Sequence, residues 1–557
     1  MNPETELQYD GCTVSRIRKE RNGIWLLTCR TDRNEAKIQW KIDCARCSFR
    51  FFSSLKVDRK LPPDWDAAVR FEYSRNIPAI SLVDAADGNL LSFAVSAAQA
   101  VVELRAGVVE ENSKLDCSIK IENIATETEF QVCMDCRNVP YWESYSGVIR
   151  ELSSPVMVPQ AAFFPVFSSW YAFHQNLAAE ELEKLCPQML ELGLKTIIVD
   201  DGWQCNDARR GYAYCGDWEI SPERFPDFAG HLEKVHRMGI KYVLWAALPL
   251  LGEKSAHYSR FQKFCFKHQP GLKCGVLDPR YPEVREYLTE RMVSLARLGI
   301  DGLKLDFLDS VADSEAGERK SGQDCDTTAA GMDLLLSAIF RECRKISPEF
   351  MFEFRQQYFG FEMQKYGTMF RAADCPADVL SNRIRTLELR LACPGKAIHS
   401  DMLMWSPEST PGEAALQILN CIFTVPQISV RLEQLSAEHA QMLKTMLSLF
   451  SRYSKTLLHG ELKPTAPQFN FPVVYAEDEE NFIAVVYAQN AVINLPDLSG
   501  RNLLVINAGA PSGNIVINAP SMPPGTVFDA LGNVCANYTK GDKGLNIRQI
   551  PLGGFFR

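Results

Sequence analysis

The middle of the chain alternates short, uninterrupted apolar runs with segments of helical periodicity, and this alternation restricts the fold more than any other feature. After about residue 160, eight apolar runs precede a turn or helix, and they end near Trp170, Trp203, Trp245, Asp306, Arg355, Asp374, Asp401 and Ser429. Segments with apolar residues at helical spacing separate these runs, for example over 177–192, 222–238, 281–298 and 332–346. Strands that are apolar throughout are typical of a parallel sheet buried on both faces. The repeated units therefore predict a (β/α)8 TIM barrel.

The alternative for such a pattern is a doubly wound open sheet. That fold normally has a glycine-rich first turn, and the chain has none. The two ends of the chain differ from the middle, because many short strands broken by turn residues replace the helical pattern. We predict a multidomain protein with an N-terminal β-sandwich over 1–155, a catalytic barrel over 156–457 and a small C-terminal β-sandwich over 458–557.

Composition excludes several classes of protein. The 557 residues carry a net charge of −9 without a basic block, which argues against a partner that is nucleic acid or an anionic membrane. No apolar stretch is long enough to cross a membrane, and the first residues lack the features of a signal peptide, so we expect a cytoplasmic protein. The 18 cysteines are then expected to be free thiols. The pairs Cys44/Cys47 and Cys133/Cys136 could form a zinc site, but small apolar residues in strands explain them better.

Carboxylates and tryptophans gather at the predicted strand ends, which is where a TIM barrel carries its chemistry. The carboxylates are Asp200, Asp201, Asp306, Asp374 and Asp401, and the tryptophans are Trp170, Trp203, Trp245 and Trp405. Carboxylates accept hydrogen bonds from sugar hydroxyls, while indoles stack on the apolar face of a sugar ring. Lys304 lies on the same strand face as Asp306 and can keep it ionised, as a nucleophile requires. Taken singly, each aspartate could be a helix cap and each tryptophan a core residue.

The motifs in this region resemble the α-galactosidase clan of retaining glycoside hydrolases, and are closest to family 36. They are SSWY at 168–171, IVDDGW at 198–203, RFPD at 224–227, HRMGIK at 236–241, LDP at 277–279, PEVREYL at 282–288 and GLKLDF at 302–307. SDML at 400–403 is similar to the sister family 27. The resemblance covers most of the predicted barrel, and the layout of three domains also fits.

The resemblance implies a role for each matched residue. Asp306 would be the nucleophile and Asp374 the general acid and base, and the two carboxyls would flank the sugar at about 5 Å separation. Substrate-binding roles are implied for Asp200 and Asp201 at the 4- and 6-hydroxyls, Lys304 beside the nucleophile, Trp245 in the pocket and Arg371 near the 2-position. Trp203 is a further candidate at its strand end. Trp65 could reach the site from the N-terminal domain, with anchoring of a surface loop as the alternative.

The chain departs from the family pattern at two places. Arg371 and Asp374 are one residue closer than the family often has them, so Asp378 remains a second candidate for the acid. The end of the fifth strand lacks the Cys/Gly-rich loop that many relatives place beside the 2-hydroxyl. It carries Glu353, Arg355 and Gln356 instead, which could reshape the 2-position pocket or accept a charged substituent.

We therefore expect a retaining exo-α-glycosidase, foremost an α-galactosidase, with a small-molecule carbohydrate as its substrate and no cofactor or metal. An α-N-acetylgalactosaminidase and a transglycosylase use the same carboxylates and stay open, as do the aglycone and assembly into a homo-oligomer. A non-catalytic carbohydrate-binding barrel is disfavoured because both candidate carboxylates and the lysine are present. A metal-dependent barrel is disfavoured because His231 and His236 lie on a predicted helix, and only His399 lies on a strand.

Overall fold

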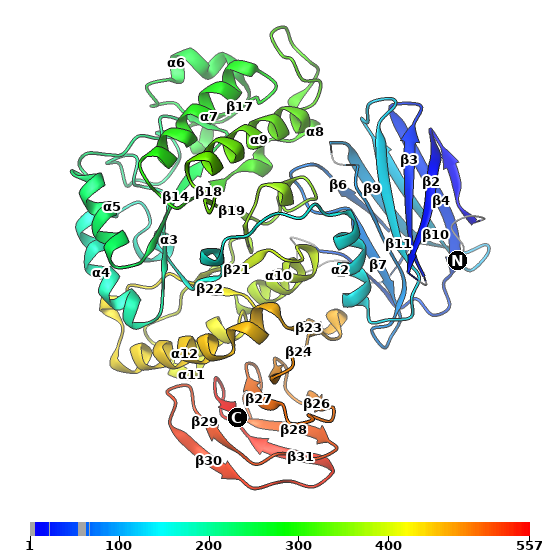
Figure 1. Cartoon of the computed structure of the whole chain (residues 1–557), viewed down its shortest axis with the longest axis vertical. Coiled ribbons are helices and arrows are strands. Elements are labelled where there is room, and N and C mark those ends of the chain that lie inside the picture. The colour runs from blue at the N-terminus through cyan, green and yellow to red at the C-terminus, as the bar shows by residue number, and fades with distance from the viewer. Residues whose placement is uncertain (1–5, 22, 54–62, 66, 98) are drawn as a thin grey trace.

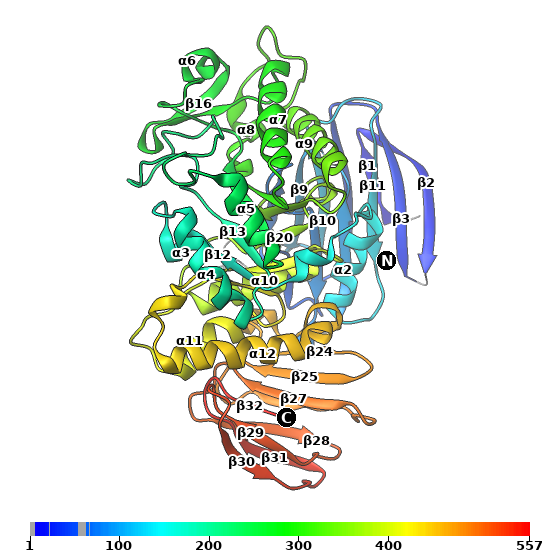
Figure 2. The same cartoon turned by 60° about the vertical axis from the view of Figure 1, so that its left-hand side comes forward.

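The computed structural model describes residues 6–21, 23–53, 63–65, 67–97 and 99–557. Three parts lie against one another (Figure 1). A β-sandwich at the N-terminal end (blue and cyan) flanks a barrel (green and yellow), and a second β-sheet region (orange and red) lies beneath the barrel. The view from the side shows α12 (Ala437–His459) between the barrel and the C-terminal sheets (Figure 2).

Two antiparallel sheets form the N-terminal sandwich. The strands of the first, in spatial order, are β1 (Gln8–Asp10), β4 (Glu35–Asp43), β10 (Lys114–Glu122), β9 (Val101–Val109) and β6 (Ala68–Phe71). Those of the second are β2 (Cys12–Arg21), β3 (Ile24–Thr31), β11 (Glu129–Asp135), β8 (Asn89–Val95), β7 (Ala79–Val83) and β5 (Phe49–Phe51). Alternate residues of β10, such as Leu115 and Ile119, are buried between the sheets, which is why its sequence alternates. Helix α2 (Tyr141–Leu152) joins the sandwich to the barrel.

Eight parallel strands close into a barrel, as predicted, and the closure excludes the open sheet. The strands are β12 (Val166–Ser168), β13 (Thr196–Val199), β14 (Lys241–Ala247), β18 (Gly302–Asp306), β19 (Met351–Arg355), β20 (Met369–Arg371), β21 (Ala397–Leu403) and β22 (Val425–Ile428). Nearly all of their residues are buried, which matches their lack of alternation. Trp170 lies in the short helix α3 (Ser169–Phe173) beyond the first strand, and Trp203 lies in the turn beyond the second.

The barrel is surrounded by helices, most of which the sequence predicted. They are α4 (Ala179–Glu191), α5 (Phe228–Arg237), α7 (Pro282–Arg297), α9 (Thr328–Ile346), α10 (Val379–Ala392), α11 (Pro411–Leu419) and α12. The prediction of a helix over 222–238 was wrong at its start, because the Asp227 side chain accepts a hydrogen bond from the Gly230 N–H (2.9 Å) and caps α5 there. Thr327 caps α9 in the same way, so that the helix begins at Thr328, four residues before its predicted start.

One insertion between elements of the barrel was not predicted from the sequence. Between β14 and α7, the chain forms a three-stranded antiparallel sheet from β15 (Leu250–Gly252), β17 (Cys274–Leu277) and β16 (Cys265–Gln269), with α6 (Tyr258–Phe261) between its strands in sequence. The short helix α8 (Asp313–Ala316) follows β18.

The C-terminal region consists of two sheets around their own apolar core. The larger sheet contains β23 (Glu461–Pro464), β24 (Val473–Glu477), β25 (Asn481–Val486), β27 (Asn502–Asn507), β32 (Phe555–Phe556), β29 (Gly525–Phe528) and β30 (Val534–Tyr538). The smaller contains β26 (Val492–Asn494), β28 (Asn514–Ala519) and β31 (Gly544–Gln549). The boundaries predicted at 155/156 and 457/458 stay predictions.

All 18 cysteines are free thiols in this structure. Cys133 is fully buried in β11, and the Cys44 thiol donates to the Ser113 carbonyl oxygen (2.8 Å). Within the described ranges, no three or more His, Cys, Asp or Glu side chains form a group that could hold a metal ion. The described helices also include none that is long and apolar enough to cross a membrane.

Candidate active site

Charged side chains from four adjacent strands meet at the carboxyl end of the barrel. Register brings them together, because Lys304 of β18 pairs with Glu353 of β19, and Arg355 of β19 pairs with Arg371 of β20. Asp306 ends β18, two residues beyond Lys304 and on the same face of the strand. These residues lie at the end of a barrel where enzymes of this fold carry their chemistry.

Asp306 is held by donors on both carboxylate oxygens. Its Oδ1 accepts from Arg355 Nε (2.7 Å), from the Phe307 main-chain N–H (2.7 Å) and from the Tyr358 hydroxyl (3.2 Å). Its Oδ2 accepts from the Trp245 indole N–H (3.1 Å). Burial by itself raises the pKa of this carboxyl, but Arg355, followed by Lys304 and Arg371, outweighs burial and holds the pKa well below its ordinary value. The side chain remains 13% exposed, so an ionised carboxylate is within reach of a ligand.

Aromatic packing positions the donors of Asp306. The Tyr212 ring stacks on Trp245 with centroids 6.1 Å apart, and Trp218 meets Trp245 edge-on at 5.9 Å. The Trp203 indole N–H donates to the main-chain oxygen of Trp245 (2.9 Å), and Trp203 itself is fully buried. In this structure Trp203 therefore supports Trp245 from behind and presents no surface of its own.

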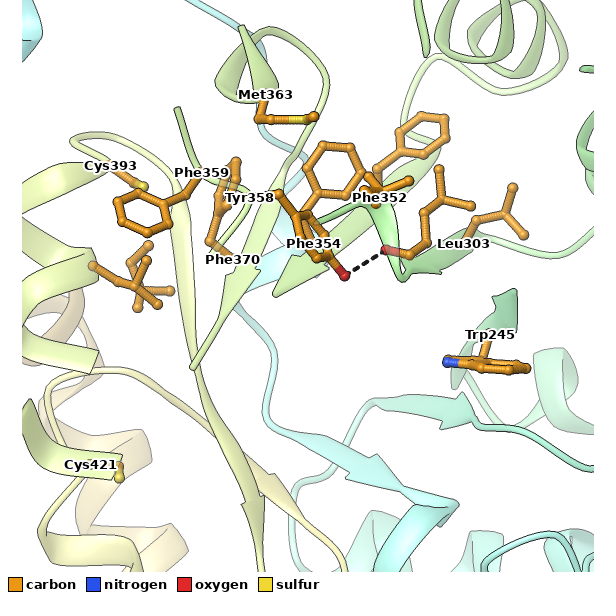
Figure 3. Packing of buried hydrophobic residues seen from close by; sticks show 14 of the residues in the cluster. Trp245, Leu303, Phe352, Phe354, Tyr358, Phe359, Met363, Phe370, Cys393 and Cys421 are labelled. Atoms are coloured by element: carbon orange, nitrogen blue, oxygen red, sulfur yellow. Dashed lines mark hydrogen bonds between the residues drawn. The ribbon is translucent and has the colours of Figure 1, made fainter. Parts of the chain in front are cut away.

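A buried aromatic cluster is formed by residues of the fifth and sixth strands and the loop after the fifth. Phe352, Phe354 and Phe370 pack together, and the Tyr358 hydroxyl also donates to the main-chain oxygen of Leu305 (3.0 Å) (Figure 3). Because Leu305 directly precedes Asp306, this contact fixes the backbone that carries the carboxylate. Tyr358 follows β19 in a segment with no periodic pattern, and the sequence offered no signal for its role.

Arg371 joins two further carboxylates. Its buried guanidinium donates from one nitrogen to Asp401 (2.6 Å) and to Asp374 (2.9 Å). Asp401 is fully buried and also accepts from the Tyr171 hydroxyl (3.2 Å) and the Cys375 main-chain N–H (2.6 Å). Its pairing with Arg371 is a supporting contact that the sequence analysis did not identify, although Asp401 and Tyr171 both lie in the quoted motifs.

Asp374 and Asp378 differ in surroundings. The Asp374 side chain is 58% exposed, so it can face a ligand while it accepts a hydrogen bond from Arg371. Burial and the charge of Asp306 raise the pKa of Asp374, but Arg371, together with Lys304 and Arg355, outweighs them, and the pKa lies below its ordinary value. Asp378 caps α10, where its two oxygens accept from the Ser381 main-chain N–H (3.0 Å) and hydroxyl (2.5 Å). The capping role explains the presence of Asp378 without any catalytic function.

The two adjacent aspartates beyond β13 face different partners. The Lys304 ammonium donates to Asp200 Oδ2 (2.6 Å), and both side chains are buried. Asp201 accepts at its two oxygens from the amides of Gln175 (2.6 Å) and Gln204 (2.7 Å). Burial raises the pKa of Asp201 to about 7, which leaves it partly protonated at neutral pH. Neither glutamine was singled out from the sequence.

Trp65 is the predicted site residue that lies farthest from the others in sequence. Its side chain is 65% exposed on the sandwich, and its main-chain oxygen accepts from Arg105 (2.7 Å). A reach into the barrel stays a prediction. Trp170 is partly exposed, with the Arg210 guanidinium 5.2 Å from the centroid of its ring.

Comparison with known proteins supports the resemblance inferred from the motifs. Residues 159–356 match the family model described as melibiase. "Alpha-galactosidase 2" of Pediococcus pentosaceus is 24% identical over 212 residues, which are 36% of this chain and 29% of that protein. The "Bifunctional alpha-galactosidase/sucrose kinase AgaSK" of Mediterraneibacter gnavus is 25% identical over 161 residues, 27% of this chain and 17% of that protein. The matched regions thus span less than a third of the length of these relatives.

The fold is shared over a longer range. The GH36 alpha-galactosidase AgaA from Geobacillus stearothermophilus superposes with a TM-score of 0.66 at 14% sequence identity, over 99% of this chain and 87% of that chain. The superposition shows that the fold is shared, and the matches together confirm the resemblance to family 36 α-galactosidases that the sequence predicted.

Proposed function

We propose that the chain is a retaining exo-α-glycosidase that removes terminal α-linked galactose through a covalent glycosyl–enzyme intermediate. The observation that carries the proposal is the pair Asp306 and Asp374 at the barrel mouth, the first ionised and held by four donors, the second exposed and hydrogen-bonded to Arg371. The names of the relatives support galactose as the sugar that is removed, and the structure of a variant of AgaA has been solved with raffinose.

The two carboxylates divide the chemistry. Asp306 attacks the anomeric carbon while Asp374 protonates the glycosidic oxygen, and the leaving group departs as an alcohol. In the second step Asp374 takes a proton from water while the water oxygen attacks the anomeric carbon. The ester bond to Asp306 breaks, which restores its carboxylate and releases the sugar with its original anomeric configuration. The charge of Asp306 raises the pKa of Asp374, and ester formation removes that charge. The pKa of Asp374 therefore falls between the two steps, in the direction that converts an acid into a base.

Asp374 can donate its proton readily only when it is separated from Arg371. While its guanidinium contacts Asp374, the pKa of that carboxyl stays below its ordinary value, which disfavours proton donation. Arg371 keeps its shorter contact with the buried Asp401 when Asp374 turns toward a glycosidic oxygen. We propose that substrate binding separates Asp374 from Arg371 and thereby raises its pKa.

The glycone preference rests on Asp200 and Lys304. Each carboxylate oxygen can accept a further hydrogen bond, so Asp200 can hold a sugar hydroxyl while it remains paired with Lys304. A buried site built for an axial 4-hydroxyl rejects the equatorial isomer strongly, because a buried acceptor position on the carboxylate then lacks its hydrogen bond. Binding roles for Asp201, Trp245, Arg371, Arg355 and Trp65 also remain proposals, whereas the buried Trp203 would act only through Trp245. A cytoplasmic location and assembly into a homo-oligomer are proposals as well.

A panel of p-nitrophenyl glycosides tests the proposal directly. We expect turnover of the α-galactoside with strong preference over the α-glucoside, and ¹H NMR of the first-formed sugar should show the α anomer. Preference for the α-GalNAc substrate would identify an α-N-acetylgalactosaminidase, and sugar transfer to added acceptors in preference to water would identify a transglycosylase. Binding of galactosides without turnover of any substrate would refute the enzymatic proposal in favour of a carbohydrate-binding barrel.

A further inference from the structure

A turn of the N-terminal sandwich inserts between two loops at the mouth of the barrel. This segment, residues 73–76, follows β6 and is called the 73–76 turn. The Ser74 hydroxyl donates to the Val311 main-chain oxygen (2.9 Å), and the Arg75 guanidinium donates to the Asp309 main-chain oxygen (3.2 Å). The Asn76 main-chain N–H donates to the Gln357 main-chain oxygen (2.7 Å). The turn thus bonds to the loop after β18 and to the loop after β19.

The contact is close as well as hydrogen-bonded. A Cβ atom added to Gly360, in the loop after β19, would lie 2.9 Å from the main-chain oxygen of Asn76 and 3.4 Å from that of Tyr73. Two backbones therefore approach so closely that only glycine fits between them. The Tyr73 hydroxyl anchors the turn from the other side by donating to Asp333 Oδ1 (3.1 Å) on α9.

The two loops that the turn contacts carry the partners of Asp306. Asp309 lies three residues beyond Asp306, and its Oδ1 accepts from one end of the Arg355 guanidinium (3.3 Å). The Nε of the same guanidinium donates to Asp306 (2.7 Å). Tyr358, in the second loop, donates to Asp306 as well (3.2 Å). A continuous series of contacts therefore runs from Arg75 through Asp309 and Arg355 to Asp306.

We propose that the 73–76 turn is a positioning element of the active site, through which the N-terminal sandwich orients the carboxylate of Asp306. The proposal deepens the proposed function and rests on it for the identity of Asp306 as nucleophile. Arg355 has a long, flexible stem, and its planar guanidinium must meet Asp306 and Asp309 at the same time. By holding the backbone of Asp309, Arg75 selects the one orientation of Arg355 that also meets Asp306.

The charges around Arg75 are consistent with this assignment. Arg75 also pairs with Glu315 (3.0 Å), which accepts from Lys267 as well. Its charge is thus compensated outside the site, and the Asp309 carboxylate stays available for Arg355. Loss of the turn contacts would free the loop after β18 and let Arg355 turn away from Asp306.

Variants of Arg75 test the proposal, with Arg70→Ala as the matched control. Arg70 lies in β6 of the same sandwich, and its guanidinium pairs with Glu122 of β10 (3.0 Å), so that this ion pair stays within the sandwich. For Arg75→Ala we expect kcat/KM to fall by about tenfold to a hundredfold, because misplacement of a reacting group by about 1 Å costs that much. The acid limb of kcat/KM should also move to higher pH, since Arg355 then stabilises ionised Asp306 less. Arg75→Lys should restore part of the rate, and Ser74→Ala should show a smaller loss.

Hydrogen exchange separates this inference from the proposed function. In Arg75→Ala, the main-chain amides of 306–312 and 356–360 should exchange faster than in the wild type, while Arg70→Ala leaves them unchanged. That readout applies even if the wild type hydrolyses no glycoside, an outcome that would refute the proposed function alone. The positioning role is refuted if an active wild type and Arg75→Ala share the same kcat/KM and acid limb, or if exchange in the two loops is unchanged.

Discussion

Replacement of Arg355 by methionine should make Asp306, the proposed nucleophile, harder to ionise. Arg355 Nε lies 2.7 Å from Asp306 Oδ1, and among the charges near Asp306 it does most to hold the pKa of that carboxyl below its ordinary value. A hydrogen bond to a charged group contributes about 1.5–3 kcal/mol, and one pKa unit corresponds to about 1.4 kcal/mol. Loss of Arg355 should therefore raise the pKa of Asp306 by about 1 to 2 units. Methionine keeps much of the apolar stem and leaves the Trp245 and Tyr358 contacts in place.

The assay is the pH dependence of kcat/KM on an activated aryl α-galactoside. A nucleophile acts in its ionised form, so activity is present above its pKa and is lost as the pH falls through it. A raised pKa therefore moves the acid limb to higher pH, by about 1 to 2 pH units for Arg355→Met. Arg355→Lys, which keeps the charge without the planar fork, should show a smaller move. Arg341→Met, at an exposed arginine on α9 that pairs with Glu342, is the control and should leave the limb unchanged. An acid limb at the same pH in Arg355→Met and the wild type would refute the electrostatic reasoning.

Three further predictions concern individual carboxylates. Asp306→Ala should lower the rate by several orders of magnitude, and azide should partly rescue it with a β-configured azide product; turnover near the wild-type rate would exclude Asp306 as nucleophile. Asp374→Ala should lower the turnover of substrates with poor leaving groups more than that of aryl glycosides. Asp378→Ala should instead lower the melting temperature, through loss of a helix cap worth about 0.5–2 kcal/mol. If Asp378→Ala showed the dependence on the leaving group and Asp374→Ala did not, the acid would be Asp378. The pKa of Asp201 is raised to about 7, so its contribution to stability is full at low pH and is lost as the pH rises to about 7. The melting temperature of Asp201→Asn should therefore fall less between pH 5 and 8 than that of the wild type. An identical dependence of the melting temperature on pH in both proteins would contradict the assigned ionisation.

The order of the barrel strands could be predicted because the signal is local. A parallel strand buried on both faces is apolar at every position, as in 196–199, and that pattern needs no knowledge of its neighbours. The placement of Lys304 and Asp306 on one face follows from the alternation of side chains along a strand. The predicted start of a helix was wrong where a capping side chain set the boundary. Asp227 caps α5, so that the helix begins six residues later than the apolar pattern suggested.

The partners of the candidate nucleophile could not be predicted, because closure of the barrel and docking of the sandwich bring them together. Arg355 lies 49 residues from Asp306, Tyr171 lies 230 residues from Asp401, and Arg75 lies 234 residues from Asp309. No periodicity relates such positions, since each contact depends on strand register and on the way two separate cores pack. From the local order of its side chains, the sequence by itself determined a barrel with carboxylates at its strand ends. Only the tertiary structure decided that Arg355 pairs with Asp306 and that the N-terminal sandwich contacts the loop beside it, because those contacts join segments that meet only after the chain has folded.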